Sequence, residues 1–315
     1  MTQEKVKVLY IAGLGRSGST LLDSILGQID GFFSIGEFNN VWDCGVIANR
    51  RCGCGAPFRE CETWRRIFAR AFGGMDEAPA REMAELRARV DRPRYVPLLF
   101  VPGLRERVLR RRMGLYLRNL EALYRAVREV TGCRLVIDSS KTPLHAYLLE
   151  LTGAVDLYVV HLVRDARAVA YSWQRVRRQL DSDSYMLRVN PAKCALAWDL
   201  NQTATDLLWR RRTGCYLRIR YEDFVASPRQ WLGRIVALVG EAQSRLPLVG
   251  EDCAEIKPAH GIFGNPSRFR TGLVKLSPDE EWRHQMKISH RLLVTALTFP
   301  VLARYGYPVM LPNGD

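Results

Sequence analysis

The chain has 315 residues, of which 47% are hydrophobic and 25% are charged. These values are ordinary for a globular protein and exclude a disordered or collagen-like chain, and the length suits one α/β domain with insertions. Lysine and arginine together number 47 against 33 acidic residues, which leaves a formal net charge of +14. This excess suggests an anionic partner, which could be nucleic acid, a membrane surface, a phosphorylated cofactor or an acidic substrate.

The N-terminal stretch, MTQEKVKVLYIAGLG, lacks the pattern of a secretory signal, because its apolar residues lead directly into glycines with no cleavage site after them. The apolar segment at residues 95–104 contains Pro97 and Pro102 and is far too short to span a bilayer. We therefore expect a soluble, cytoplasmic protein without a membrane span.

Four short runs rich in β-branched or aromatic residues predict strands at residues 7–12 (KVLYIA), 134–137 (RLVI), 157–163 (LYVVHLV) and 216–220 (YLRIR). A polar turn and a helical pattern follow each run, with a helix expected over residues 166–178. This alternation predicts a P-loop-like α/β fold of three layers, with a central parallel sheet flanked by helices. Ligands of such sheets bind beyond the carboxyl ends of the strands.

A helical, arginine-rich insertion is expected at about residues 78–131, within a single domain that spans residues 1–315. Its apolar residues recur at helical spacing and predict a face packed on the core: Leu120, Leu123, Tyr124, Val127 and Val130. The arginine-dense stretch at residues 105–112 is more typical of a solvated helix face than of a binding surface.

The first turn, residues 13–20 (GLGRSGST), connects a predicted strand to a predicted helix and suits an anion, because N–H groups and the helix dipole converge there. The segment has the spacing of the P-loop pattern at Gly13, Gly18 and Thr20, but Ser19 occupies the position of the lysine. That substitution argues against hydrolysis of ATP or GTP, and the nearest cation is Arg16 instead. A tight turn without a ligand is the alternative interpretation.

Residues 16–22 (RSGSTLL) resemble the 5′-phosphosulfate loop of sulfotransferases that use 3′-phosphoadenosine 5′-phosphosulfate (PAPS), in particular bacterial and protein-tyrosine members. Three further segments are similar to this family and occur in its order. They are residues 161–173 (HLVRDARAVAYSW), similar to the 3′-phosphate motif, 220–224 (RYEDF), and 264–272 (GNPSRFRTG), similar to the segment that closes over the nucleotide.

The resemblance implies that PAPS is the sulfuryl donor and that Arg164, Ser172, Arg270 and Gly272 contact its 3′-phosphate, with Tyr221 against the adenine. Arg268 is a further candidate anion ligand. The whole set of expected donor-binding residues is Arg16, Ser17, Gly18, Ser19, Thr20, Leu21, Arg164, Ser172, Tyr221, Arg268, Arg270 and Gly272. For the segment at residues 161–173, the alternative is an ordinary helix with an Asp165–Arg167 surface pair. For Tyr221, the alternative is ordinary packing of its ring.

Sulfuryl transfer to an alcohol needs a base at the acceptor hydroxyl and cations around the transferring group, and it requires no metal. Residues 34–38 (SIGEF) are similar to the segment of protein-tyrosine sulfotransferases that carries the general base, which implies this role for Glu37. Residues 138–143 (DSSKTP) are similar to the segment whose lysine stabilises the sulfuryl group, here Lys141. With Arg16 they form the predicted catalytic set. Helix capping or a surface position is the alternative for Glu37.

Two histidines are left outside this set. His145 follows Lys141 closely but lacks the spacing of family members with a histidine base, and His260 precedes the nucleotide-closing segment.

Four cysteines gather at Cys44, Cys52, Cys54 and Cys61. Their spacing is not a usual zinc finger, and structural thiols, a disulfide or a metal site all stay open. Similar segments recur in bacterial sulfotransferases, and we expect this loop to lie beside Glu37.

Two other functions remain as alternatives: a nucleotide-dependent kinase with a degenerate P-loop, and a basic nucleic-acid-binding protein. No nucleic-acid-binding motif supports the second. The acceptor could be a small molecule, a sugar or a peptide tyrosine, and the sequence does not choose among them.

Overall fold

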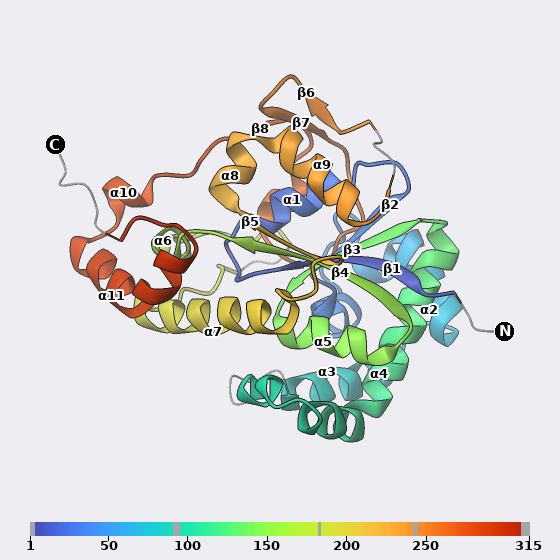
Figure 1. Ribbon diagram of the computed structural model, residues 1–315. Coiled ribbons are helices and arrows are strands. Elements are labelled where there is room, and N and C mark those ends of the chain that lie inside the picture. Colours follow the sequence, from blue (N-terminus) through green and yellow to red (C-terminus); the bar gives the residue numbers. More distant parts are fainter. Residues whose placement is uncertain (1–3, 91–94, 182–183, 242–244, 310–315) are drawn as a thin grey trace.

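The computed structural model describes residues 4–90, 95–181, 184–241 and 245–309. Its centre is a sheet of five parallel strands in the order β2-β3-β1-β4-β5, with helices on both faces (Figure 1). The strands are β1 (Val6–Ala12), β2 (Phe32–Gly36), β3 (Leu135–Lys141), β4 (Val155–Val163) and β5 (Tyr216–Arg220). The predicted α/β class with a central parallel sheet is therefore confirmed.

The four predicted strands correspond to β1, β3, β4 and β5, whereas the edge strand β2 was not predicted. Its sequence, FFSIG, contains Phe32, Phe33 and Ile35, which favour a strand, so its composition resembles that of the predicted strands and this short run was overlooked. A second, antiparallel sheet was also not predicted. It consists of β6 (Leu248–Val249), β7 (Cys253–Ile256) and β8 (Gly272–Lys275), which are too short to leave a periodic signal.

Alternate residues of β1 face opposite layers of helices, because successive side chains of a strand point to opposite sides of the sheet. Leu9 and Ile11 pack with α1 (Ser19–Leu26) and α9 (Pro228–Leu238). Val8 and Tyr10 pack with α4 (Leu104–Thr131) and α5 (Pro143–Thr152). Both faces of the sheet are thus buried, as a parallel sheet requires.

Further helices complete the layers. They are α2 (Glu62–Phe72), α3 (Glu77–Val90), α6 (Ala166–Gln174), α7 (Pro191–Trp209), α8 (Tyr221–Ala226), α10 (Trp282–Gln285) and α11 (Ile288–Arg304). The helix expected over residues 166–178 therefore ends earlier, at Gln174.

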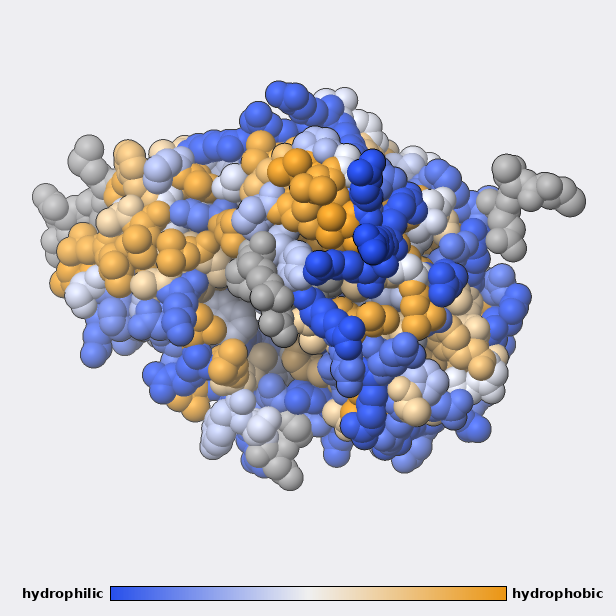
Figure 2. Space-filling view, turned by 90° about the horizontal axis from the view of Figure 1, so that it is seen from below, coloured by the Kyte–Doolittle hydropathy of each residue, from blue (hydrophilic) through white to orange (hydrophobic). Residues whose placement is uncertain are grey.

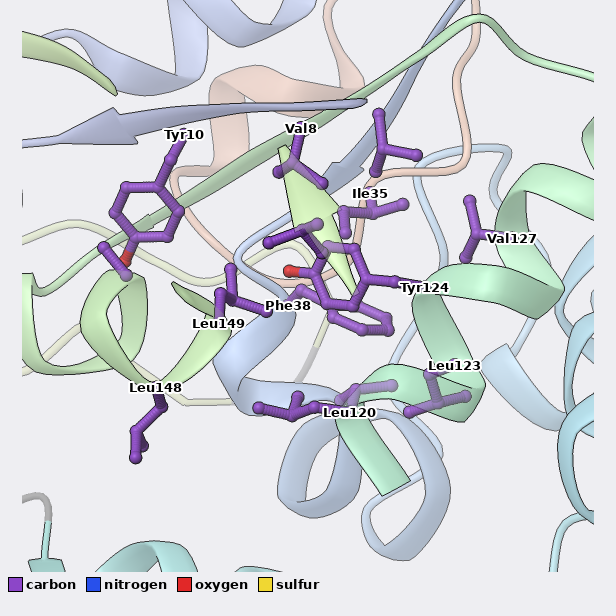
Figure 3. Packing of buried hydrophobic residues seen from close by; sticks show 14 of the residues in the cluster. Val8, Tyr10, Ile35, Phe38, Leu120, Leu123, Tyr124, Val127, Leu148 and Leu149 are labelled. Atoms are coloured by element: carbon purple, nitrogen blue, oxygen red, sulfur yellow. The ribbon is translucent and has the colours of Figure 1, made fainter. Parts of the chain in front are cut away.

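The region expected to be a helical insertion contains α3 and α4, while its residues 91–94 lie outside the described residues. Its apolar stripe packs on the sheet as predicted: Leu120, Leu123, Tyr124 and Val127 are buried, and Val130 is partly buried against the same cluster. Figure 3 shows the Tyr124 ring lying between α4 and Phe38, with which it makes an edge-on contact at 5.2 Å. Along the stretch 105–112, four of the five arginines are exposed, in agreement with a solvated face.

Polar residues cover much of the surface seen from below, and apolar residues gather toward the side on which α11 lies (Figure 2). The exposed apolar side chains of α11 include Ile288, Leu292, Leu293 and Phe299. Among the described residues, none of the helices combines the length and the apolar character that crossing a bilayer requires.

Candidate active site

The turn between β1 and α1 has the backbone of an anion-binding loop. Gly18 precedes the first residue of α1 and has a φ of 92°, and Arg16 has a φ of 76°, which is unusual for a residue with a side chain. A Cβ atom at position 18 would overlap the ring of Tyr221, so the loop needs glycine there. Leu21 N–H already donates to the Gly18 carbonyl at 3.0 Å, whereas the N–H groups of Ser19 and Thr20, at the start of α1, precede the first intrahelical hydrogen bond and can donate to an anion.

Arg16 lies over the Trp173 ring, with its guanidinium carbon 4.8 Å from the ring centre, and one nitrogen donates to the Met186 sulfur at 3.1 Å. Its Nε is buried and has no hydrogen-bond partner among the described residues. Burial, and next the positive charge of Arg177, lower the pKa of Arg16 to about 10. A bound anion beside this guanidinium would stabilise its charged form and so oppose the lowering of its pKa.

A cavity of about 770 Å³ opens at the carboxyl ends of the strands, beside this loop. It brings together ten of the predicted site residues from both ends of the sequence. Its lining includes Arg16, Gly18, Ser19, Thr20, Leu21, Glu37, Lys141, Arg164, Ser172 and Arg270.

Four predicted donor-binding residues do not line this cavity. The Ser17 hydroxyl is buried beneath the loop without a hydrogen-bond partner among the described residues. Tyr221 is buried under Gly18, and its hydroxyl donates to the Ser277 carbonyl at 3.4 Å. Gly272 lies in the exposed strand β8.

Arg268, the fourth of these residues, ties three segments of the chain together instead of facing the cavity. It donates to the carbonyls of Gly261 and Arg51 at 3.1 and 2.8 Å and forms an ion pair with Asp181 at 2.9 Å. Its guanidinium is therefore already compensated.

Arg164, at the end of β4, supports the loop from the other side. Its guanidinium lies 4.8 Å from the centre of the Tyr221 ring, donates to the Arg16 carbonyl at 3.0 Å and pairs with Asp279 at 3.1 Å. Ser172 reaches the same cavity from α6. The neighbouring Asp165–Arg167 pair is buried, so it is not the surface pair of the alternative interpretation.

Glu37 and Lys141 form an ion pair and also line the cavity. Glu37 directly follows β2, and its N–H donates to the Ile262 carbonyl at 2.9 Å. Lys141 ends β3 with a φ of 72°, and its carbonyl accepts from Gly13 at 3.1 Å. Two neighbouring strand ends thus place a carboxylate and an ammonium side by side, and both side chains are largely buried.

The model of the sulfotransferase family matches residues 9–244 of the chain, which contain both strand ends and the loop. The chain belongs to the sulfotransferase family. None of the curated proteins matches its sequence.

Solved structures of two sulfotransferase domains share the fold of this sulfotransferase. The domain from the olefin synthase of Synechococcus PCC 7002 is 18% identical, with a TM-score of 0.55 over 98% of each chain. The domain from the curacin biosynthetic pathway is 15% identical, with a TM-score of 0.54 over 97% of this chain and 99% of that one. At these identities the likeness concerns the fold alone.

The two histidines near the predicted site of this sulfotransferase lie away from the cavity. His145 is buried, with Nε2 3.4 Å from an Asp138 oxygen, and it does not line the cavity. The His260 ring faces the cysteine-rich loop, where its Nδ1 lies 3.4 Å from the Cys61 sulfur.

Several cavity residues were not predicted. Trp173, Arg175 and Arg177 follow Ser172 on and after α6, and Asp279 and Glu281 come from the segment before α10. The run SWQRVRR was the only signal for the first three, because a cluster of arginines is more often a solvated surface.

Proposed function

We propose that this sulfotransferase moves the sulfuryl group of PAPS to a hydroxyl of a small-molecule or carbohydrate acceptor by in-line displacement, with Glu37 as the general base. The observation that carries the proposal is one cavity that joins the loop at residues 13–20 to the Glu37–Lys141 pair. A peptide tyrosine is a further candidate acceptor of the same chemical class.

The residues around the loop fit a phosphosulfate. The buried Arg16 Nε has no hydrogen-bond partner among the described residues, and Arg16 lines the cavity, so this guanidinium can donate to an anion there. Arg164, Ser172 and Arg270 line the cavity and are the proposed ligands of the 3′-phosphate, because a guanidinium fork and a hydroxyl match a phosphate monoester. A cavity of about 770 Å³ lies within the usual size of ligand sites.

When bound, PAPS supplies the sulfuryl group, and its nucleotide part is the leaving group. Glu37 accepts the proton of the acceptor hydroxyl at a carboxylate oxygen, which raises the nucleophilicity of that hydroxyl. Lys141 stabilises the Glu37 carboxylate before the proton moves and the negative charge on the transferring group afterwards. Arg16 contributes a second positive charge from the loop.

The kinase alternative is disfavoured by Ser19 in the lysine position of the P-loop pattern. The two reactions differ in whether their rate depends on magnesium. The proposed sulfuryl transfer should proceed equally fast with and without added Mg²⁺, whereas a kinase would use ATP and depend on the ion.

The proposal is tested by incubating the protein with PAPS and a panel of alcohols, sugars, phenols and tyrosine peptides. Mass spectrometry should detect a sulfated product and an equal amount of 3′-phosphoadenosine 5′-phosphate. If the protein binds PAPS but produces neither compound with any hydroxyl acceptor, the proposed reaction is wrong.

A further inference from the structure

Three thiols and one imidazole converge beside the cavity, outside the residues proposed for the reaction. The group consists of Cys52, Cys54, Cys61 and His260, and the four atoms able to bind a metal all lie within 4.8 Å of one another. The fourth member is thus His260 and not Cys44, which the sequence had placed with the other three cysteines.

The separations inside the group are those of ligands around one tetrahedral ion. With Zn–S bonds of about 2.3 Å and Zn–N bonds of about 2.0 Å, two sulfurs lie about 3.8 Å apart and a sulfur and a nitrogen about 3.5 Å apart. The sulfurs of Cys54 and Cys61 are 3.7 Å apart, and His260 Nδ1 lies 3.4 Å from the Cys61 sulfur and 3.8 Å from the Cys52 sulfur.

The contacts of His260 orient its ring for this role. Nε2 lies 3.3 Å from the Thr63 hydroxyl, which can accept a hydrogen bond from Nε2–H, and in that tautomer the lone pair of Nδ1 faces the sulfurs. The His260 carbonyl accepts from Trp64 Nε1 at 2.9 Å. A hydrogen bond from the second ring nitrogen to a neighbouring group is the usual support of a metal-binding histidine.

Backbone hydrogen bonds hold the loop that carries Cys52, Cys54 and Cys61 (the cysteine loop) around these four side chains. Cys52 N–H donates to the Ala56 carbonyl at 2.8 Å, Gly55 N–H donates to the Cys52 carbonyl at 2.9 Å, and Gly53 N–H donates to the Gly261 carbonyl at 3.0 Å. Cys52 and Cys61 are buried, and Cys54 is exposed, which gives a metal ion a way in from solvent.

We propose that Cys52, Cys54, Cys61 and His260 hold a structural Zn²⁺ ion. Thiolate and imidazole ligands favour zinc over magnesium or calcium, and four protein ligands leave no position for a substrate. A disulfide between Cys54 and Cys61 would use only two of the four groups and would not explain why His260 faces the remaining sulfur.

The ion connects the cysteine loop to the segment that supports Glu37. His260 and Gly261 directly precede Ile262, whose carbonyl accepts from the Glu37 N–H and whose own N–H donates to Ile35 at 3.1 Å. Phe263 and Gly264, the next residues along the chain, line the cavity. The zinc site thus fixes one wall of the cavity without taking part in the reaction.

The test is the metal content of the full-length protein purified without chelators, measured by inductively coupled plasma mass spectrometry. We expect about one zinc per chain in the wild type and in Cys44→Ser, a matched control from the same loop. Cys61→Ser and His260→Ala should bind at least tenfold less zinc. Metal content is independent of sulfuryl transfer, so a negative result would not bear on the proposed function.

A second measurement covers variants that fold poorly. Cobalt(II) added to the zinc-free wild type should give the visible bands of a tetrahedral site and a thiolate-to-cobalt charge-transfer band. His260→Cys should keep the metal and intensify the charge-transfer band by about one third, because three thiolates become four. Three results would each overturn the proposal. The first is less than about 0.1 zinc per chain in the folded wild type together with no cobalt bands. The second is iron in place of zinc, and the third is a peptide linked by a Cys54–Cys61 disulfide.

Discussion

Replacing Glu37 by glutamine separates the chemistry of this carboxylate from its role in the fold. The side chains of Glu37 and Lys141 are only 16% and 9% exposed, so the charge of one compensates that of the other. Glutamine keeps an oxygen that accepts from Lys141. We therefore expect Glu37→Gln to lower the free energy of unfolding by about 1–3 kcal/mol, the cost of weakening one buried hydrogen bond. By comparison, a substitution at position 37 that left Lys141 with no acceptor at all would lower the free energy of unfolding by about 3–5 kcal/mol.

The same substitution removes the proposed base, so turnover should fall about 10²–10⁴-fold. This loss corresponds to about 3–5 kcal/mol in the activation free energy. The affinity for 3′-phosphoadenosine 5′-phosphate should hardly change, because Glu37 is not among the proposed ligands of the donor.

The assay is steady-state sulfation of an aliphatic alcohol, with calorimetry for the nucleotide and urea unfolding for stability. Asp43→Asn is the matched control, since Asp43 also carries a paired carboxylate, 2.8 Å from Arg87, but does not line the cavity. A phenolic acceptor should lose less rate than an alcohol, because a phenol ionises near pH 10 and needs less help from a base. Full activity of Glu37→Gln on an alcohol would refute the assignment.

Two further predictions concern residues around this pair. Burial raises the pKa of Asp23 to about 7, so the folded state retains a proton that the unfolded chain releases near pH 4. The contribution of Asp23 to the free energy of unfolding should therefore fall as the pH rises from about 4 to 7, by an amount on the order of 4 kcal/mol. Asp23→Asn should lack this contribution in urea unfolding, so the difference in stability between the wild type and the variant should change over this pH range, and parallel pH profiles would contradict the expectation. Gly264→Ala should reduce turnover about tenfold or more, because the new Cβ would lie 2.8 Å from a Glu37 oxygen at a φ of 109°. Gly74→Ala, which meets nothing within 4 Å, is its control, and equal activity of the two variants would contradict the argument.

Four of the five strands of the central sheet could be predicted, because each is a run of apolar residues followed by a polar turn. The loop at residues 13–20 was likewise recognisable from glycine and hydroxyl spacing alone. The edge strand β2, which positions Glu37, was not predicted, although Phe32, Phe33 and Ile35 favour a strand and the segment pairs with β3.

Partners that are distant in the sequence were beyond prediction. Cys61 and His260 are 199 residues apart, and nothing in the spacing of the cysteines points to that histidine. Arg268 has the residue type of an anion ligand, but its charge is compensated by Asp181, 87 positions away. A sequence motif identifies the type of side chain, whereas the fold decides what that side chain faces.

The central claim is that the cavity holds a nucleotide with a 3′-phosphate, and calorimetry with 3′-phosphoadenosine 5′-phosphate and AMP tests it most directly. Arg164, Ser172 and Arg270 are proposed to contact a group that AMP lacks, and losing one partner of such a charged contact typically costs about 2–5 kcal/mol. We therefore predict that the first nucleotide binds about 30-fold to several thousandfold more tightly than AMP, and that Arg164→Ala removes most of this difference. Equal affinities of the wild type for the two nucleotides would contradict the account.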